Sequence, residues 1–406
     1  MAPSVNSRRS HLRSSAAAVS AHYPCVVIEL GSVFIRCGFA GEAKPRHVIP
    51  FGSNNEIQHL PTTIRSGQSS NTHHSVLFHG ADVNVDLNSK QQRSQIEYEV
   101  IFEPLMEHIL IDLLLCKPRN RRVVVVEHLV TPTNLRTALS KVLLQSLQVS
   151  ALLFVPFTVA MYALPTAPSG GICMVVDIGL NEARCIAVHE GNPIMNTFRC
   201  APCGYADFVR EFQNNQNDVA LTRWEDLVFA FRCALNSDMN LNEVSCTLPS
   251  TGRLVQVDVK AVKFAYSSLI GDDANDILST NTDSLIYTLL NSLLACPIDL
   301  RKVVAQNVLV MGGGAMLPDI CARVQEGTVK QASKLSKFKS LIPCTKDGGL
   351  KVVKIPFCRD MLGWIGASVF ATLDVLEIER WVTYNEEMEQ EQHAIPNAYD
   401  WLSRQN

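Results

Sequence analysis

The feature that most constrains the fold is a pattern that occurs twice: an apolar strand, an acidic residue followed two positions later by glycine, and a second strand. The first copy carries Glu29 and Gly31, and the second, roughly half the chain later, carries Asp177 and Gly179. Glycine lets backbone N–H groups approach a phosphate, and a carboxylate accepts hydrogen bonds from metal-bound water. Each copy taken singly is also an ordinary β-hairpin. Their repetition indicates two related lobes whose hairpins clamp one phosphate chain, with a metal between the carboxylates.

A third glycine-rich stretch lies at residues 307–318, NVLVMGGGAMLP. Residues 308–311 read as a short buried strand, three glycines end it, and a helical pattern resumes near Leu317. A strand, a glycine turn and a helix often hold a phosphate, because the helix N-terminus presents unpaired donors and partial positive charge. The same pattern also fits a tight turn that binds nothing.

Length, charge and cysteine usage narrow the class of protein. A chain of 406 residues is long enough for two to three domain-sized units. A net charge of −3 argues against nucleic acid as the main partner. The longest apolar run, residues 151–164, is too short to span a membrane and contains a proline. Thirteen cysteines without regular spacing indicate reduced, intracellular thiols, and the single C-x-x-C pair, Cys200 and Cys203, is read as coincidental rather than as a metal or redox site.

Three polar stretches interrupt this pattern. Residues 1–22 are rich in serine, alanine and arginine, and we interpret them as a disordered tail, although a mitochondrial transit peptide has a similar composition. Residues 51–94 read as a small, loop-rich insertion whose histidines lack further ligands at a useful spacing. Residues 386–406 are polar and locally acidic, which is typical of a terminal tail.

Hydrophobic periodicity predicts the remaining elements. Helical spacing is found at residues 100–116, 135–143, 224–235, 285–294 and 364–376. Apolar runs predict strands at residues 123–126, 152–155 and 253–259. Pro156 suits the first turn of the helix expected after the second of these strands. Four lysines between residues 330 and 339 indicate a solvated face.

Taken in order, these motifs resemble the actin family over about residues 25–385. The motifs that carry the resemblance are Glu29-x-Gly31, Cys37-Gly-Phe-Ala-Gly41, Pro45-Arg46, Asp177-x-Gly179, Gly312-Gly313 with Met316 and Pro318, and Trp364-Ile365-Gly366. The resemblance implies an α/β, actin-like fold of two lobes with a duplicated βα core, shared with sugar kinases and heat-shock chaperones, around a central nucleotide cleft. It places the first large lobe at residues 23–50, 95–163 and 361–406, and a reduced small insertion at residues 51–94. The second large lobe falls at residues 164–202 and 281–360, and its small subdomain at residues 203–280.

Departures from the family pattern affect the phosphate and metal positions. In the first hairpin Glu29 stands where actins have aspartate, Val33 where they have a second glycine, and Arg36 where they have the phosphate-facing lysine. A guanidinium is not equivalent to a compact ammonium. In the second hairpin Leu180 and Asn181 replace an Asp-Gly pair, so one metal-facing carboxylate is missing.

Other departures affect turnover and base recognition. Pro156 stands where actins place the glutamine that positions the attacking water, and proline has no side-chain hydrogen bond to offer. Leu317 replaces the tyrosine beside the adenine, and the Lys-Glu pair that reaches ribose and base falls in an apolar stretch at residues 228–231. We therefore expect ATP hydrolysis to be residual or absent, and we predict no catalytic residue.

The resemblance still implies a set of residues for ATP or ADP with Mg²⁺. The nucleotide contacts expected from it are Gly31, Ser32, Arg36, Asp177, Gly179, Gly312, Gly313, Gly314 and Met316. Glu29 and Asp177 are the expected metal positions, through water. The alternative is a vestigial cleft closed by packing; a bound nucleotide would act as a structural element that adds stability by linkage.

Within the family, the stretch from Cys296 to Lys302 and its continuation into the glycine loop resemble the pointed-end actin-related subfamily of dynactin. This implies a non-polymerising structural subunit of the cytoplasm and cytoskeleton that caps dynactin's actin-like filament. It would bind filament subunits near the helix around Trp364, anchor pointed-end accessory subunits, and support dynein-driven transport on microtubules. We expect no nucleic-acid partner and no membrane insertion. The alternatives are an active actin-fold ATPase and a nuclear actin-related subunit of a chromatin remodeller.

Overall fold

The computed structural model describes residues 23–32, 34–50, 94–164, 171–215, 224–236, 242–271, 283–345, 349–373 and 381–383. The expectations for residues 1–22, 51–93 and 386–406, and for Val33, lie outside the described residues. The described residues separate into two compact units. The first takes its residues from Met1–Ile49, Val85–Ala163 and Gly363–Asn406, and the second mainly from Leu164–Leu362.

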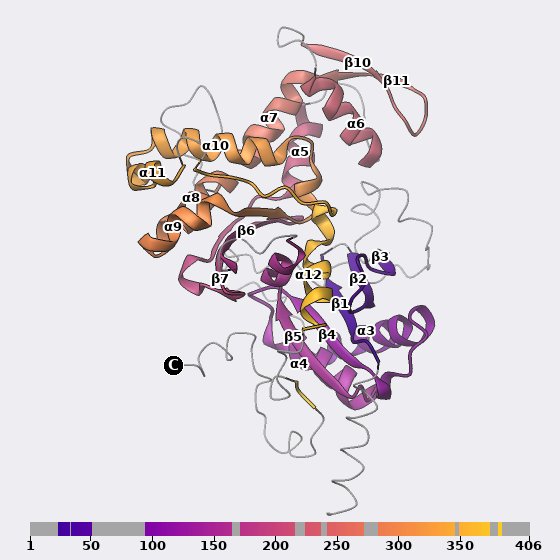
Figure 1. Cartoon of the computed structure of the whole chain (residues 1–406). Helices are drawn as coiled ribbons and strands as arrows, with labels where there is room; N and C mark the ends of the chain where they lie inside the picture. Colours follow the sequence, from indigo (N-terminus) through magenta and orange to yellow (C-terminus); the bar gives the residue numbers. More distant parts are fainter. Residues whose placement is uncertain are drawn as a thin grey trace, which may run out of the picture. The chain divides into compact units, whose positions relative to one another are not determined.

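The first unit is built on a five-stranded sheet with the order β3-β2-β1-β4-β5 (Figure 1). Its strands are β1 (Val26–Leu30), β2 (Phe34–Phe39), β3 (His47–Pro50), β4 (Arg122–Glu127) and β5 (Ala151–Pro156). Strands β1 and β2 form an antiparallel hairpin, while β4 pairs in parallel with both β1 and β5. Strands β1, β4 and β5 are almost continuously apolar and buried, as expected for parallel-paired strands of a sheet that is covered on both faces.

Helices complete the first unit. They are α3 (Gln95–Glu107), continued by a π-helical turn at His108–Leu113; α4 (Thr133–Lys141), continued at Val142–Ser146; a 3-10 turn at Phe157–Ala163; and α12 (Leu362–Phe370). Helix α3 begins earlier than its apolar spacing predicts, because Ser94 caps it in a capping box with Glu97. The helix expected after β5 is present as the 3-10 turn that begins at Phe157, but Pro156 lies just before it: it is the last residue of β5, paired with Glu127 across the sheet.

The second unit contains a sheet with the order β12-β6-β7-β8, and β9 pairs with β7. Its strands are β6 (Cys173–Ile178), β7 (Ala183–His189), β8 (Asn192–Pro193), β9 (Arg199–Ala201) and β12 (Val308–Met311). A separate antiparallel ribbon joins β10 (Glu243–Thr247) to β11 (Leu254–Asp258). Here β6 and β7 form the antiparallel hairpin and β12 pairs with β6 in parallel, the same arrangement that β1, β2 and β4 have in the first unit.

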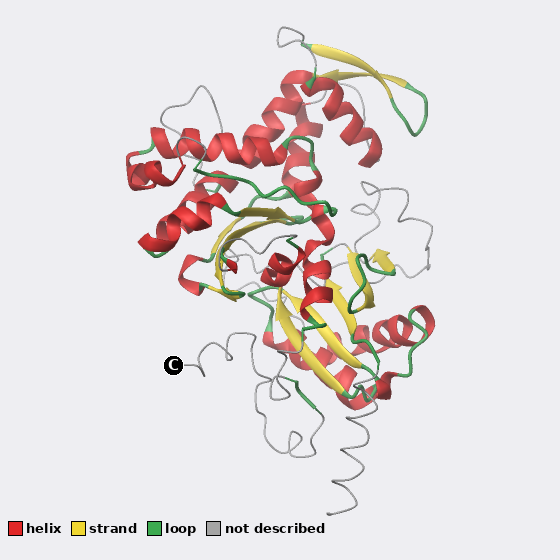
Figure 2. Cartoon of the chain, viewed as in Figure 1, coloured by secondary structure: helices red, strands yellow, loops and turns green. Residues whose placement is uncertain are grey.

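The helices of the second unit cover this sheet and the ribbon (Figures 1 and 2). They are α5 (Tyr205–Asn215), α6 (Trp224–Leu235), α7 (Val259–Ile270), α8 (Leu285–Ala295), α9 (Ile298–Gln306), α10 (Ile320–Lys334) and α11 (Ile342–Thr345). Helix α8 packs on β7 and α9 on β6, whereas α6 and α7 contact the ribbon. Side-chain caps fix the starts of α7, at Asp258, and α8, at Ser284.

Both units therefore confirm the expected α/β class, with helices packed on mixed sheets. Most predicted elements are present with shifted ends: the final apolar helix ends at Phe370, and a 3-10 turn at Gly313–Met316 precedes α10. The predicted division into smaller subdomains stays a prediction. Among the described helices, none is both long and apolar enough to cross a lipid bilayer.

Candidate functional site

The tip of the first hairpin is closed by Gly31, whose N–H donates to the carbonyl oxygen of Phe34 at 2.9 Å. A Cβ at this position would lie 2.8 Å from that same oxygen, so the tight turn itself requires glycine. Two positions back, Glu29 lies directly opposite Arg36 in the register of β1 and β2. Arg36 Nη1 donates to Glu29 Oε2 at 3.4 Å, and the two side chains are only 9% and 14% exposed.

The second hairpin repeats this arrangement at the same spacing. The N–H of Gly179 donates to the carbonyl oxygen of Glu182 at 2.9 Å, and Asp177 lies opposite Arg184 in the register of β6 and β7. Arg184 Nη1 donates to Asp177 Oδ2 at 3.1 Å, and Arg184 also forms an ion pair with the Glu182 carboxylate. In both hairpins the glycine is two residues after the acid and the arginine is seven residues after it. Each predicted metal position is thus a carboxylate already paired with an arginine of its own hairpin.

The glycine loop lies against the second hairpin within the second unit. Gly312 has a φ of +94°, and its N–H donates to the carbonyl oxygen of Arg359 at 3.1 Å. A Cβ on Gly312 would lie 2.4 Å from Asp177 Oδ1, and a Cβ on Gly314 would lie 2.4 Å from Ile178 Cγ2. These two glycines are required by close packing of the loop on the hairpin.

Gly313 and Met316 differ from their neighbours in the loop. A Cβ on Gly313 would meet no atom within 4 Å, and Met316 is 36% exposed. Of the predicted loop residues, these two face open space. Ser32, at the tip of the other hairpin, is half-buried.

The structure therefore brings the predicted residues together in two separate groups. Glu29, Gly31, Ser32 and Arg36 belong to the first hairpin in one unit. Asp177 and Gly179 lie with the glycine loop in the other.

Sequence reasoning missed three charged residues of these groups, Glu182, Arg184 and Arg359. Arg359 Nη1 donates to the carbonyl oxygen of Val310, at 2.7 Å, and so anchors the end of β12 beneath the loop. Arg184 could have been found from the repeat, because it occupies the position in the second copy that Arg36 occupies in the first.

Of the positions that the resemblance assigns to ribose and base, Leu317, Ala230 and Phe231 belong to the core of the second unit, whereas Phe229 is 38% exposed. Leu317 is 2% exposed, and Phe231 is fully buried with its ring edge-on to Phe208 and Phe212 at centroid distances of 5.2 and 4.9 Å. Beside them the Tyr266 hydroxyl donates to the carbonyl oxygen of Pro318 at 2.6 Å. These side chains offer packing where base recognition needs hydrogen-bonding groups.

The position that the resemblance assigns to water activation carries no hydrogen-bonding side chain. Pro156 ends β5 beside Glu127, whose carboxylate accepts hydrogen bonds from Arg136 Nε, at 3.1 Å, and Nη2, at 2.6 Å. Burial raises the pKa of Glu127, although Arg136 counteracts it. This buried pair is structural, and Pro156 itself has no group that could orient a water.

No metal site or disulfide replaces these functions in the described part of the chain. There, no group of three or more histidine, cysteine, aspartate or glutamate side chains is arranged to hold a metal ion. All thirteen cysteines are free thiols. Burial raises the pKa of Cys203 to about 12, and Cys200 Sγ donates to Glu182 Oε2 at 3.3 Å. The C-x-x-C pair is therefore a pair of protonated thiols in the described structure.

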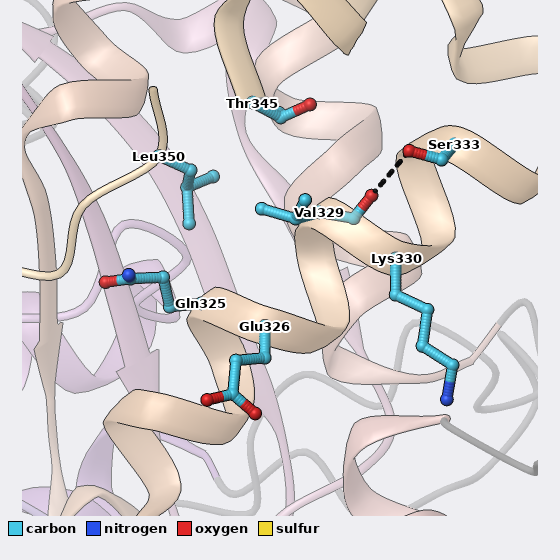
Figure 3. Close-up of a pocket in the computed structure, with 7 residues that line it drawn as sticks. All are labelled: Gln325, Glu326, Val329, Lys330, Ser333, Thr345 and Leu350. Atoms are coloured by element: carbon cyan, nitrogen blue, oxygen red, sulfur yellow. Dashed lines mark hydrogen bonds between the residues drawn. The ribbon is translucent and has the colours of Figure 1, made fainter. Parts of the chain in front are cut away.

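A pocket on the second unit lies at a different place (Figure 3). Helix α10 supplies most of its lining, with one residue from α11 and one from the segment that follows. The residues are Gln325, Glu326, Val329, Lys330, Ser333, Thr345 and Leu350. None of them belongs to the predicted site. The four lysines expected to form a solvated face, at positions 330, 334, 337 and 339, are all exposed, and Lys337 also donates to the Tyr287 hydroxyl at 3.1 Å.

The most specific sequence motifs hold α12 on the first unit's sheet. Trp364 is fully buried and its Nε1 donates to the carbonyl oxygen of Val27 at 3.1 Å. A Cβ on Gly38 would lie 2.8 Å from Trp364 Cζ2, and one on Gly366 would lie 2.0 Å from the carbonyl oxygen of Val159. The motifs that carry the resemblance are thus sites of close packing. Trp364 itself presents no surface to a partner.

Comparison with known proteins confirms the resemblance. The Actin family model matches residues 20–224 and 259–397. The chain is 20% identical over 401 residues to Actin-related protein 10 of Dictyostelium discoideum, covering 85% of this chain and 82% of that protein. It is also 20% identical over 409 residues to Actin-related protein 3 of Oryza sativa subsp. indica, with coverages of 87% and 92%. The identity to Putative actin-29 of Dictyostelium discoideum is 20% over 381 residues, with coverages of 87% and 91%.

Proposed function

Because the chain belongs to the actin family, we propose that it is a non-polymerising structural subunit that caps the pointed end of dynactin's actin-like filament. In this role it also anchors pointed-end accessory subunits and so supports dynein-driven transport on microtubules. The likeness to Actin-related protein 10 supports this placement within the family. We place the protein and its partners in the cytoplasm and the cytoskeleton, and we propose neither a nucleic-acid partner nor insertion into a membrane.

The observation that carries the proposal is that an actin-family fold has no water-orienting side chain at position 156 and has arginine-paired carboxylates at Glu29 and Asp177. Pro156 has no side-chain group to orient a water, and the carboxylates of Glu29 and Asp177 are paired with arginines. Packing motifs such as Trp364 and Gly366 meanwhile keep their structural contacts. A subunit that keeps the shape of its family without the hydrolysis cycle suits permanent termination of a filament.

The ATPase reading is tested by single-turnover release of phosphate from ATP mixed with the purified chain, with conventional actin as the positive control. We expect no release above the uncatalysed rate, because water activation lacks its side chain. Phosphate release at the rate of conventional actin would show that the chain is an active ATPase.

Contacts with the last filament subunits are proposed to use the outer surface of α12 and the residues that follow it. Trp364 is buried, so the expectation of a contact around it moves to its exposed neighbours. Val369 on α12 and Leu373 just after it are 38% and 36% exposed, so they offer apolar side chains to a partner at this end of the helix.

The decisive experiment combines purification from cytosol with filament binding in solution. Immunoprecipitation followed by mass spectrometry should recover the actin-like filament subunit together with pointed-end dynactin subunits. In co-sedimentation with filaments of that subunit, Val369→Glu should lose binding. Leu254→Glu is the matched control, because Leu254 is 65% exposed on β11 of the other unit. Elongation of the purified chain into filaments by itself, or recovery of chromatin-remodelling subunits, would contradict the proposal.

A further inference from the structure

We propose that Arg36 and Arg184 are built-in counter-ions of the two hairpins, and that they replace the divalent cation that the family resemblance implies at Glu29 and Asp177. The folded state then needs no Mg²⁺ at these carboxylates and binds none there. This inference concerns the charge balance of each hairpin and does not depend on the proposed capping function.

The first observation is that the same ion pair occurs in both copies of the repeat. In each hairpin the arginine lies directly across the strand pair from the acid, at register pairs Glu29–Arg36 and Asp177–Arg184. The nitrogen–oxygen distances are 3.4 and 3.1 Å. All four side chains are at least 86% buried, so water screens these charges little. Two matching pairs at matching positions indicate that the fold places a cation there twice.

The second observation is that little of the Asp177 carboxylate remains for a metal. Its Oδ2 accepts from Arg184, and its Oδ1 lies against Gly312, where even an added Cβ would come within 2.4 Å. The Glu182 carboxylate, which pairs with the same arginine, also accepts from the Cys200 thiol. Mg²⁺ requires near-ideal octahedral oxygen ligation and keeps several of its waters, which needs space and uncommitted oxygens.

The third consideration is electrostatic. A guanidinium keeps its charge under all physiological conditions, so the Glu29 carboxylate is neutralised permanently within its own hairpin. A divalent ion approaching either carboxylate would be repelled by the arginine already bonded to it. The residues present therefore do not fit a metal. Removing an arginine should create the need for one.

The test uses the full, nucleotide-free chain and compares thermal unfolding in EDTA with unfolding in Mg²⁺. The wild-type Tm should be the same in both, and Mn²⁺ titration followed by electron paramagnetic resonance should find no stoichiometric site. Arg184→Gln removes the guanidinium that pairs with both the Asp177 and the Glu182 carboxylates. Its Tm in EDTA should fall by roughly 6–20 °C, since breaking a buried pair is strongly destabilising. Mg²⁺ should recover part of that loss, and Mn²⁺ should now bind.

Two further variants separate this role from a merely structural one. Arg184→Lys keeps a cation and should remain insensitive to Mg²⁺. Arg136→Gln breaks a pair of similar burial that contains a single carboxylate, Glu127, and should lower Tm without recovery by Mg²⁺.

Either of two results would overturn the proposal. One is stoichiometric Mn²⁺ binding to the wild type together with a rise of its Tm in Mg²⁺. The other is a loss in Arg184→Gln that Mg²⁺ does not change. If Arg184→Gln does not fold, the wild-type titration and Arg184→Lys still decide the question. None of these readouts requires filament binding, so failure here leaves the capping proposal standing.

Discussion

Substituting adjacent glycines of the loop by alanine should have opposite effects on the second unit. Gly312 has a φ of +94°, and its added Cβ would lie 2.4 Å from Asp177 Oδ1 and 2.5 Å from the carbonyl oxygen of Ile178. Gly313 begins the 3-10 turn, and its added Cβ would meet no atom within 4 Å. The two substitutions are chemically identical and one residue apart, so each serves as the control for the other.

The expected loss of stability in Gly312→Ala is the sum of two costs. Gly312 has a φ of +94° and a ψ of 174°, a combination that glycine alone adopts readily, and placing a side chain there costs about 1–2 kcal/mol. Forcing a methyl group into closely packed backbone and carboxylate atoms costs about 1–3 kcal/mol more. Gly312→Ala should therefore lower the free energy of unfolding by about 2–5 kcal/mol. Gly313→Ala should raise it by about 0.4–1 kcal/mol, because it restricts the unfolded chain without a native clash.

Native-state hydrogen exchange measured by mass spectrometry reads this difference locally. Peptides that cover β6 and β12 should exchange about 30-fold to several thousand-fold faster in Gly312→Ala, since each 1.4 kcal/mol is a factor of ten. In Gly313→Ala the same peptides should exchange at the wild-type rate or more slowly. Equal acceleration in the two variants would refute the inference that Gly312 is held by packing on Asp177 while Gly313 faces open space.

Four further predictions concern buried groups. Alkylation followed by peptide mapping should modify the exposed Cys358 first and leave Cys37 and Cys173 unmodified, because burial raises the pKa of each to about 12. The folded-state pKa values of both thiols lie above the ordinary value of 9.0. The stability that the two buried thiols contribute is therefore fully present below about pH 9 and is lost as the pH rises toward 12. Thermal unfolding measured across that pH range should show a falling Tm. Tyr266→Phe leaves a buried carbonyl oxygen without its 2.6 Å donor and should cost about 1–3 kcal/mol in urea unfolding. Trp364→Phe removes the 3.1 Å hydrogen bond to the Val27 carbonyl oxygen, and urea unfolding should show a loss of about 1–3 kcal/mol in the free energy of unfolding. An unchanged urea midpoint would show that this hydrogen bond contributes nothing to stability.

The two hairpins could be predicted from sequence because local signals specify them completely. An apolar run, a glycine two residues after an acid, and a second apolar run leave the chain little choice but to turn back on itself. The register then follows from the turn, and the observed pairs Glu29–Arg36 and Asp177–Arg184 are what that register requires. The ion pairs do not follow from the family comparison, because a comparison of Arg36 with the lysine of actins does not include its cross-strand neighbour Glu29.

The three loop glycines could not be distinguished from sequence, because what separates them is distant along the chain. Gly312 and Gly314 pack on Asp177 and Ile178, more than a hundred residues earlier, and Gly313 does not. All three glycines have the same conformational freedom, so the sequence alone does not distinguish them. Only the tertiary contact decides which of them are committed to packing.

The helix around Trp364 shows a similar limit. Its apolar composition predicts a helix, and α12 is found at Leu362–Phe370. A helix that is apolar on nearly every side gives no indication of which side faces the protein. The structure places Trp364 against Val27 and leaves Val369 exposed. Our proposal therefore assigns the partner contact to Val369, because Trp364 is buried.

The duplicated ion pair is relevant to how an actin-family fold balances the charge of its hairpin carboxylates. A buried carboxylate without a counter-ion is costly, so a hairpin that presents one must obtain a cation from somewhere. A metal supplies that charge only while it is bound, and the stability of the fold then depends on the metal concentration by mass action. Arg36 and Arg184 are part of the chain and supply this positive charge permanently, each within its own unit. A subunit that remains at a filament end without turning over nucleotide gains from this arrangement, since its charge balance stays constant when free Mg²⁺ or nucleotide changes.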